Sequence, residues 1–169
     1  MKKYVVMILI AIVLIIGGGT FAYFHFANGG PWQGTWWGVQ DAGVNWSGDN
    51  IRNLETVTFT QNDDKTITVD HKVQQGSREV PGSLTGTGRT DGGRLVITPK
   101  NGGKELALSY SAVSKSIDTP FTNADKSTVT LKALSPENNE EMESIRSEIV
   151  QISQKPENKI DTTLSKAKS

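Results

Sequence analysis

Between Gly34 and Leu134, apolar and polar residues alternate in short runs, and turns rich in glycine separate the runs. Alternation with a period of two is typical of β-strands, in which successive side chains point to opposite faces. The segments 62–64, 90–93 and 101–103 supply Asn, Asp and Gly, residues that tolerate the positive φ angles of hairpin turns. No helical period occurs before Pro136. The pattern therefore predicts an antiparallel, all-β domain.

The alternation predicts seven strands that are joined as successive hairpins. They cover residues 34–41, 54–61, 65–74, 82–89, 94–98, 104–113 and 127–134. One side of these strands is apolar and is the expected interior; it carries Val57, Phe59, Ile67, Val69, Val73, Leu95, Ile97, Leu106, Leu108, Tyr110, Val129, Leu131 and Ala133. A small antiparallel up-and-down barrel of seven or eight strands would leave no exposed edge, so we expect it in preference to a two-sheet sandwich.

A helix is predicted directly after the last strand. Ser135 is a suitable N-cap and Pro136 a suitable first helical residue. An apolar stripe then repeats at helical spacing until Pro156 and consists of Met142, Ile145, Ile149 and Ile152. We expect this amphipathic C-terminal helix to dock on the barrel wall. A self-associating coiled coil is the alternative, although the run is shorter than the three or four heptads that such a coil needs. Residues 34–153 then form one domain, and the polar residues 154–169 form a disordered tail.

Residues 4–26 contain no Asp, Glu, Lys or Arg and follow two lysines, Lys2 and Lys3. As a helix this run would be roughly 35 Å long, enough to cross a hydrocarbon core about 30 Å thick. We therefore expect residues 1–27 to form a transmembrane helix with a cytoplasmic N-terminus. Residues 28–33 would link it to an extracytoplasmic domain in a bacterial-type envelope. A cleaved signal peptide, which would leave a secreted or periplasmic protein, is the alternative.

The triplet Gly34-Thr35-Trp36 stands at the start of a strand meander that ends in one helix, and this arrangement resembles the lipocalin (calycin) pattern. The resemblance implies that Trp36 plugs the closed end of a lipocalin-like barrel. It also implies that residues 41–53 form a long first loop, which carries Trp46 and partly lids the cavity. Lys132 in the last strand occupies the place where the family usually has an arginine that stacks on the tryptophan.

Composition excludes several kinds of chemistry. The chain has no cysteine, so it has no disulfide, thiolate nucleophile or zinc–thiolate site. Its 18 basic and 18 acidic side chains are well mixed, and no basic patch indicates nucleic-acid binding. His71 is the only histidine outside the apolar run, which is too few for a histidine metal site. We predict no catalytic residue, metal ligand or cofactor, and the alternative is a hydrolase that uses acids not paired in the sequence.

The candidate ligand-binding residues are Trp46, His71, Tyr110 and Trp37. Trp37 follows Trp36 in a predicted strand, so the two indoles must point to opposite faces, and indole faces stack on apolar ligands. An aromatic belt next to the membrane is the alternative for Trp32 and Trp37. His71 lies on the inward face of its strand, either as a hydrogen-bonded interior histidine or as a polar contact for a ligand.

These features together predict a membrane-anchored, extracytoplasmic binding module for an apolar or amphiphilic small molecule. The alternative is a non-enzymatic structural or assembly protein that docks an envelope protein. A cavity lined by His71 and Tyr110 would favour binding, whereas a filled interior would favour the structural alternative.

We expect the N-terminal segment to stay attached, because the aromatic residues within 21–26 suit a membrane interface better than a peptidase site. Mass spectrometry of the protein extracted from membranes should find the intact N-terminus. A mature protein that begins at or near Tyr23 would contradict a retained anchor.

Overall fold

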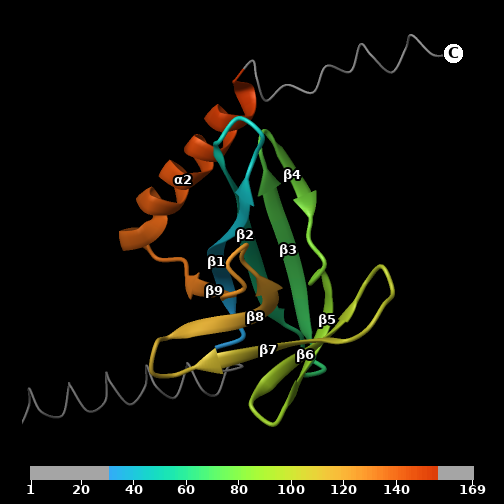
Figure 1. Ribbon diagram of the computed structural model, residues 1–169. Coiled ribbons are helices and arrows are strands. Elements are labelled where there is room, and N and C mark those ends of the chain that lie inside the picture. Colours follow the sequence, from blue (N-terminus) through green and yellow to red (C-terminus); the bar gives the residue numbers. More distant parts are fainter. Residues whose placement is uncertain (1–30, 156–169) are drawn as a thin grey trace, which may run out of the picture.

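The structure is a computed structural model that describes residues 31–155 (Figure 1). The predicted anchor at 1–27 and nearly all of the predicted tail lie outside the described residues. The described elements are β1 (Gly34–Val44), β2 (Asn50–Gln61), β3 (Ile67–Gln75), β4 (Arg78–Pro81), β5 (Gly86–Asp91), β6 (Arg94–Pro99), β7 (Leu106–Ser111), β8 (Ser116–Thr122), β9 (Thr128–Ala133) and α2 (Pro136–Gln154). Within 31–155, no helix combines the length and the apolarity that crossing a membrane requires.

Eight of the strands close into an antiparallel barrel. Around the barrel the order is β2, β1, β9, β8, β7, β6, β5 and β3, and β3 pairs back with β2. The short strand β4 lies beside the last residues of β3, while β5 pairs with the first residues of β3, so β4 and β5 share one edge. The barrel is thus confirmed over the sandwich. An eight-stranded barrel followed by one helix is compatible with a lipocalin-like fold.

Apolar side chains fill the end of the barrel at which β1 begins and much of its interior. The buried cluster consists of Trp32, Trp36, Val57, Phe59, Ile67, Val69, Leu84, Leu95, Ile97, Leu108, Ile117 and Leu131. Trp32 packs edge-on to Phe59, and Trp36 packs edge-on to Tyr110, with ring centroids 5.8 and 6.2 Å apart. The predicted inward face is confirmed for most of its members, whereas Ala133 is exposed.

A second apolar core lies outside the barrel, between its wall and α2. Trp37 of β1 and Leu54 of β2 pack there against Met142 and Ile149 of the helix. Figure 1 shows α2 running alongside these first two strands. The helical stripe therefore docks on the barrel wall, as the sequence predicts. Asn138 fixes the start of the helix, because its Oδ1 accepts a hydrogen bond from the backbone N–H of Ser135 at 3.0 Å.

Trp37 and Lys132 differ from their expected roles. The Lys132 ammonium lies 4.2 Å from the ring centre of Trp37, so it stacks on Trp37 and not on Trp36. The indole N–H of Trp37 donates to Asn138 Oδ1 at 3.2 Å. Trp37 is 1% exposed and Trp32 is 3% exposed. Both are therefore core residues, and placing them in an aromatic belt at the membrane is wrong.

Two strands, β4 and β8, were not predicted from the alternation. β8 contains Pro120, which cannot donate to a strand ladder and therefore weakens a strand prediction. In the structure the pairing of β8 with β9 shifts register between Asp118 and Thr122, so the proline sits at the irregularity. β4 has only four residues and is too short to show a clear alternation.

The prediction of a long first loop at 41–53 is also wrong. β1 continues to Val44 and β2 begins at Asn50, so the connection is a short turn. A register shift between Asp41 and Gly43 lets the hairpin continue, and Gly43 adopts a positive φ of 99° there. Trp46 therefore stands at the tip of a long hairpin, 83% exposed.

The second core makes a testable contribution to stability. Replacing Ile149, which is 4% exposed, by alanine should lower the free energy of unfolding by about 2–5 kcal/mol, the usual cost of truncating a buried Ile. Urea unfolding followed by circular dichroism measures this change. Val113→Ala is the matched control, since Val113 is 98% exposed and its truncation should have no measurable effect. An unchanged midpoint for Ile149→Ala would mean that the helix is not part of the folded unit.

Candidate functional site

Two hollows lie at the end of the barrel opposite to Trp32. One is a polar pocket inside the barrel, and the other is an apolar hollow between the β1–β2 hairpin and α2. Asn53 and Gln75, which face each other across the β2–β3 pairing, line both of them. We call this region the open end, because the opposite end is filled by the aromatic cluster around Trp36.

The polar pocket has a volume of about 240 Å³. Its polar lining residues are Gln40, Asn53, Glu55, His71, Gln75 and Ser83. Side chains that alternate with core residues supply most of this lining: Glu55 precedes Val57 on the inward face of β2, and His71 follows Val69 on that of β3. The interior therefore changes from apolar to polar along its length.

A buried acid–histidine pair forms the floor of this pocket. Nε2 of His71 lies 2.6 Å from Oε2 of Glu55, and the two residues are 1% and 3% exposed. Nδ1 of His71 accepts a hydrogen bond of 3.1 Å from the backbone N–H of Leu84. A backbone N–H can only donate, so Nδ1 carries no proton and the ring proton is on Nε2, which donates to Glu55. His71 is therefore neutral here, and Glu55 has no cationic partner in the pair.

The segment between β4 and β5 is shaped to surround His71. Gly82 donates its backbone N–H to the carbonyl of His71 at 2.7 Å, and a Cβ on Gly82 would lie 2.0 Å from Nδ1. The Thr85 hydroxyl donates to the same carbonyl at 3.0 Å and accepts the His71 backbone N–H at 3.1 Å. On the other side the ring of Phe121 stacks on the imidazole at 5.6 Å. These contacts fix the ring, and only glycine fits at position 82.

Glu55 is the residue that sequence reasoning missed. The alternation does indicate an inward position for Glu55, because it lies two residues before Val57 and four before Phe59 on the predicted inward face. The strand register places Val57 opposite His71 and Glu55 opposite Val73. Glu55 is thus the diagonal neighbour of His71, a separation that a long side chain can bridge.

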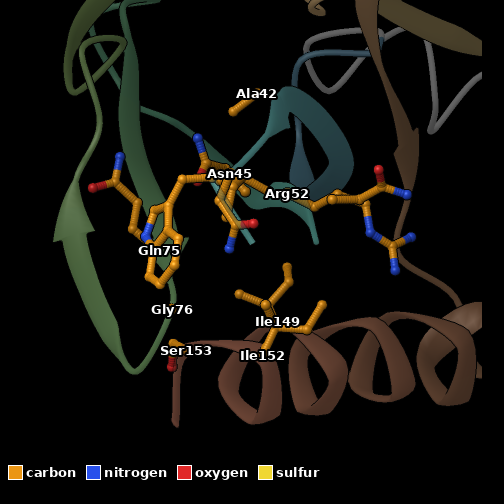
Figure 2. Close-up of a pocket in the computed structure, with 12 residues that line it drawn as sticks. Ala42, Asn45, Arg52, Gln75, Gly76, Ile149, Ile152 and Ser153 are labelled. Carbon is orange, nitrogen blue, oxygen red and sulfur yellow. The ribbon is translucent and has the colours of Figure 1, made fainter. Parts of the chain in front are cut away.

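The apolar hollow has a volume of about 500 Å³. Figure 2 shows Ile149 and Ile152 pointing into it from α2, with Ala42 and Asn45 on the side of the hairpin. The β3–β4 turn closes one side, where Gly76 approaches Ser153 so closely that a Cβ on Gly76 would lie 2.7 Å from the Ser153 Cβ. Trp46 and Ile51 add further apolar surface.

Ion pairs hold the walls of the apolar hollow together. Arg52 of β2 pairs with Glu148 of α2, and Lys155 at the end of the helix pairs with Asp49 of the hairpin turn. Asn45 shapes that turn, because its Oδ1 accepts the backbone N–H groups of Ser47 and Asp49 at 2.9 and 2.8 Å. The two ion pairs thus link the hairpin to the helix on both sides of the hollow.

The four predicted site residues fall in four different surroundings. Trp46 lines the apolar hollow and His71 the polar pocket, so these two lie on neighbouring hollows that meet at Asn53. Tyr110 packs against Trp36 in the barrel core and does not line the pocket of His71. Trp37 lies beneath α2. The open end therefore brings together Trp46 and His71 but neither Tyr110 nor Trp37.

Two acidic residues outside the pocket, Asp64 and Asp125, accept hydrogen bonds within turns. The Thr66 side-chain hydroxyl donates to Asp64 at 2.6 Å, and this hydrogen bond lowers the pKa of the Asp64 carboxyl. Ser127 lowers the pKa of Asp125 in the same way. Within the described part of the chain, no three His, Asp or Glu side chains are grouped so that they could hold a metal ion.

No protein family model matches the chain. No curated protein matches it either. The function must therefore be argued from the geometry of the open end.

Gly82→Ala should disturb the pocket, because the added methyl group cannot fit beside the His71 ring. We expect a loss of about 1–3 kcal/mol in the free energy of unfolding, the usual cost of overpacking. Urea unfolding measures it. Ser83→Ala is the matched control, since Ser83 is an exposed neighbour and its change should stay within about 0.5 kcal/mol. Equal stability of both variants would contradict the close packing of residue 82 on His71.

Proposed function

We propose that this protein is a membrane-anchored binding module of the cell envelope, which takes an apolar or amphiphilic small molecule at the open end of its barrel. The observation that carries the proposal is the apolar hollow beside Trp46. Its volume of about 500 Å³ lies in the range of small-molecule sites, which combine apolar walls with a few polar groups. Here Ile149 and Ile152 give the apolar wall, and Asn53 and Gln75 the polar rim.

The lipocalin-like resemblance also supports a ligand site at the open end of the barrel. Trp36 of the Gly34-Thr35-Trp36 triplet is buried in the filled end, as the resemblance implies for a plug. A ligand would then enter from the opposite end, where the hairpin with Trp46 stands. Because the interior is filled up to the pocket of His71, the ligand would lie at the rim of the barrel, between the hairpin and α2, and not in a deep cavity.

The direction of β1 determines which side the site would face. β1 has 11 residues, so it extends for roughly 35 Å at about 3.3 Å per residue. It begins beside Trp32, next to the end of the predicted anchor and linker. With residues 1–27 in a membrane, the open end would point away from the bilayer. We therefore expect the ligand to arrive from the aqueous side.

Docking of an envelope protein is the second candidate function. It is favoured by the exposure of Val44 and Trp46, which are 65% and 83% exposed on the same hairpin. The hydrolase alternative gains no support from the buried pair. Both nitrogens of His71 are already engaged, one by Glu55 and one by Leu84, so neither can take a proton from a nucleophile in this geometry.

The binding proposal is tested with the full chain in lipid nanodiscs, titrated with 1-octanol. Trp46 is the exposed indole among Trp32, Trp36, Trp37 and Trp46, so its emission should shift to shorter wavelength as apolar ligand covers it. Trp46→Phe should remove this response. Ile152→Asp should weaken binding at least tenfold, because it places a charge against the ligand with little loss of core packing.

Val113→Asp is the matched control for Ile152→Asp. It introduces the same charge at an exposed apolar residue of the β7–β8 connection and should leave the octanol response unchanged. Absence of any Trp46 response in the unmodified chain would favour docking of a partner protein. An equal response in the Ile152→Asp variant would place the ligand elsewhere.

A further inference from the structure

The second oxygen of Glu55 is unpartnered. Oε2 accepts a hydrogen bond from Nε2–H of His71, but no donor within residues 31–155 makes a hydrogen bond to Oε1. The Glu55 side chain is 4% exposed, and it lines the polar pocket. Among the described residues, only Nε of Arg52 and Nε of Arg146 are fully enclosed without a hydrogen-bond partner, so Oε1 of Glu55 keeps contact with the space of the pocket. A group that donates a hydrogen bond can therefore reach Oε1 from the pocket.

The charge in the pocket is also uncompensated. Neutral His71 contributes no positive charge, and neither Lys nor Arg lines the pocket. As a carboxylate, Glu55 is thus the single charged group among the lining residues. A buried charge is normally paired, and here the described residues offer no pair. The pocket is therefore complementary to a cation that also carries N–H donors.

We propose that the pocket binds the primary ammonium group of a small organic molecule, with Glu55 as its counter-ion. This inference rests on the proposed function only in taking the open end as the ligand entrance. An ammonium group has three donors. One would reach Oε1 of Glu55, and the side-chain oxygens of Asn53 and Gln75 at the rim are acceptors for the others.

The surroundings also select the shape of the ligand. Phe121, stacked on His71, gives the pocket an aromatic wall, on which both a cation and an apolar carbon skeleton pack favourably. Asn53 and Gln75 line the apolar hollow as well, so the carbon skeleton of the ligand can continue from the pocket toward Ile152. The volume of about 240 Å³ suits an amine of small size.

The test compares benzylamine, which is a cation at neutral pH, with benzyl alcohol, which has nearly the same shape and no charge. The full chain in lipid nanodiscs is titrated with each probe, and the amide signal of Leu84 is followed by NMR, because this N–H donates to His71. We expect benzylammonium to bind at least tenfold more tightly than benzyl alcohol. Equal affinities would overturn the proposal.

Glu55→Gln removes the charge but keeps an oxygen that can accept the His71 proton, so it should abolish the preference for benzylammonium. Glu105→Gln is the matched control, since it removes one negative charge from the Arg89 ion pair outside the pocket and should keep the preference. A preference that survives Glu55→Gln would overturn the proposal. If Glu55→Gln does not fold, Ser83→Phe serves instead: it fills the pocket from an exposed position and should weaken benzylammonium binding at least tenfold.

The two proposals fail in different ways. Octanol binding at Trp46 together with equal affinities for the benzyl probes would support the proposed binding module and contradict the ammonium site. Benzylammonium binding without an octanol response would support the ammonium site and contradict the proposed apolar site. Tighter binding of a lysine tripeptide than of benzylammonium would overturn the assignment to a small molecule.

Discussion

Trp36 and Trp37 are neighbours in β1, and the pleat of the strand sends them to opposite faces. One indole fills the barrel, and the other supports α2 on the outer wall. The remaining architecture depends on this division, because the helix is held where Trp37 and Leu54 offer an apolar outer surface. From there α2 runs toward the turn of the hairpin, where Lys155 at the end of the helix pairs with Asp49, and the apolar hollow lies between the two.

The barrel interior divides along its length into an apolar part and a polar part. The apolar part around Phe59 supplies packing that does not require any polar group to be satisfied. The polar part instead buries Glu55 and His71 in a network with the backbone of Leu84. Burying such groups adds less stability than apolar packing of the same volume would.

The local sequence pattern predicted most of the barrel but less of the site. Inward residues such as Val69 and Leu108 were predicted because alternation is a local property. Pro120 concealed β8, whose strand pairing is decided by tertiary contacts. The site depends on neighbours across strands, and the diagonal contact of Glu55 with His71 follows only from the register. The prediction of a lid at 41–53 failed for the same reason. Pairing between β1 and β2 extends the hairpin beyond the residues that alternate in the sequence.

The most direct test of the account concerns the proton on His71. Histidine labelled with ¹⁵N gives signals from only two residues in this chain, His25 and His71, and a His25→Asn variant assigns them. We expect His71 to be neutral, with its proton on Nε2, which donates to Glu55, and with Nδ1 unprotonated. A spectrum with the His71 proton on Nδ1 would contradict the buried pair and the site built on it.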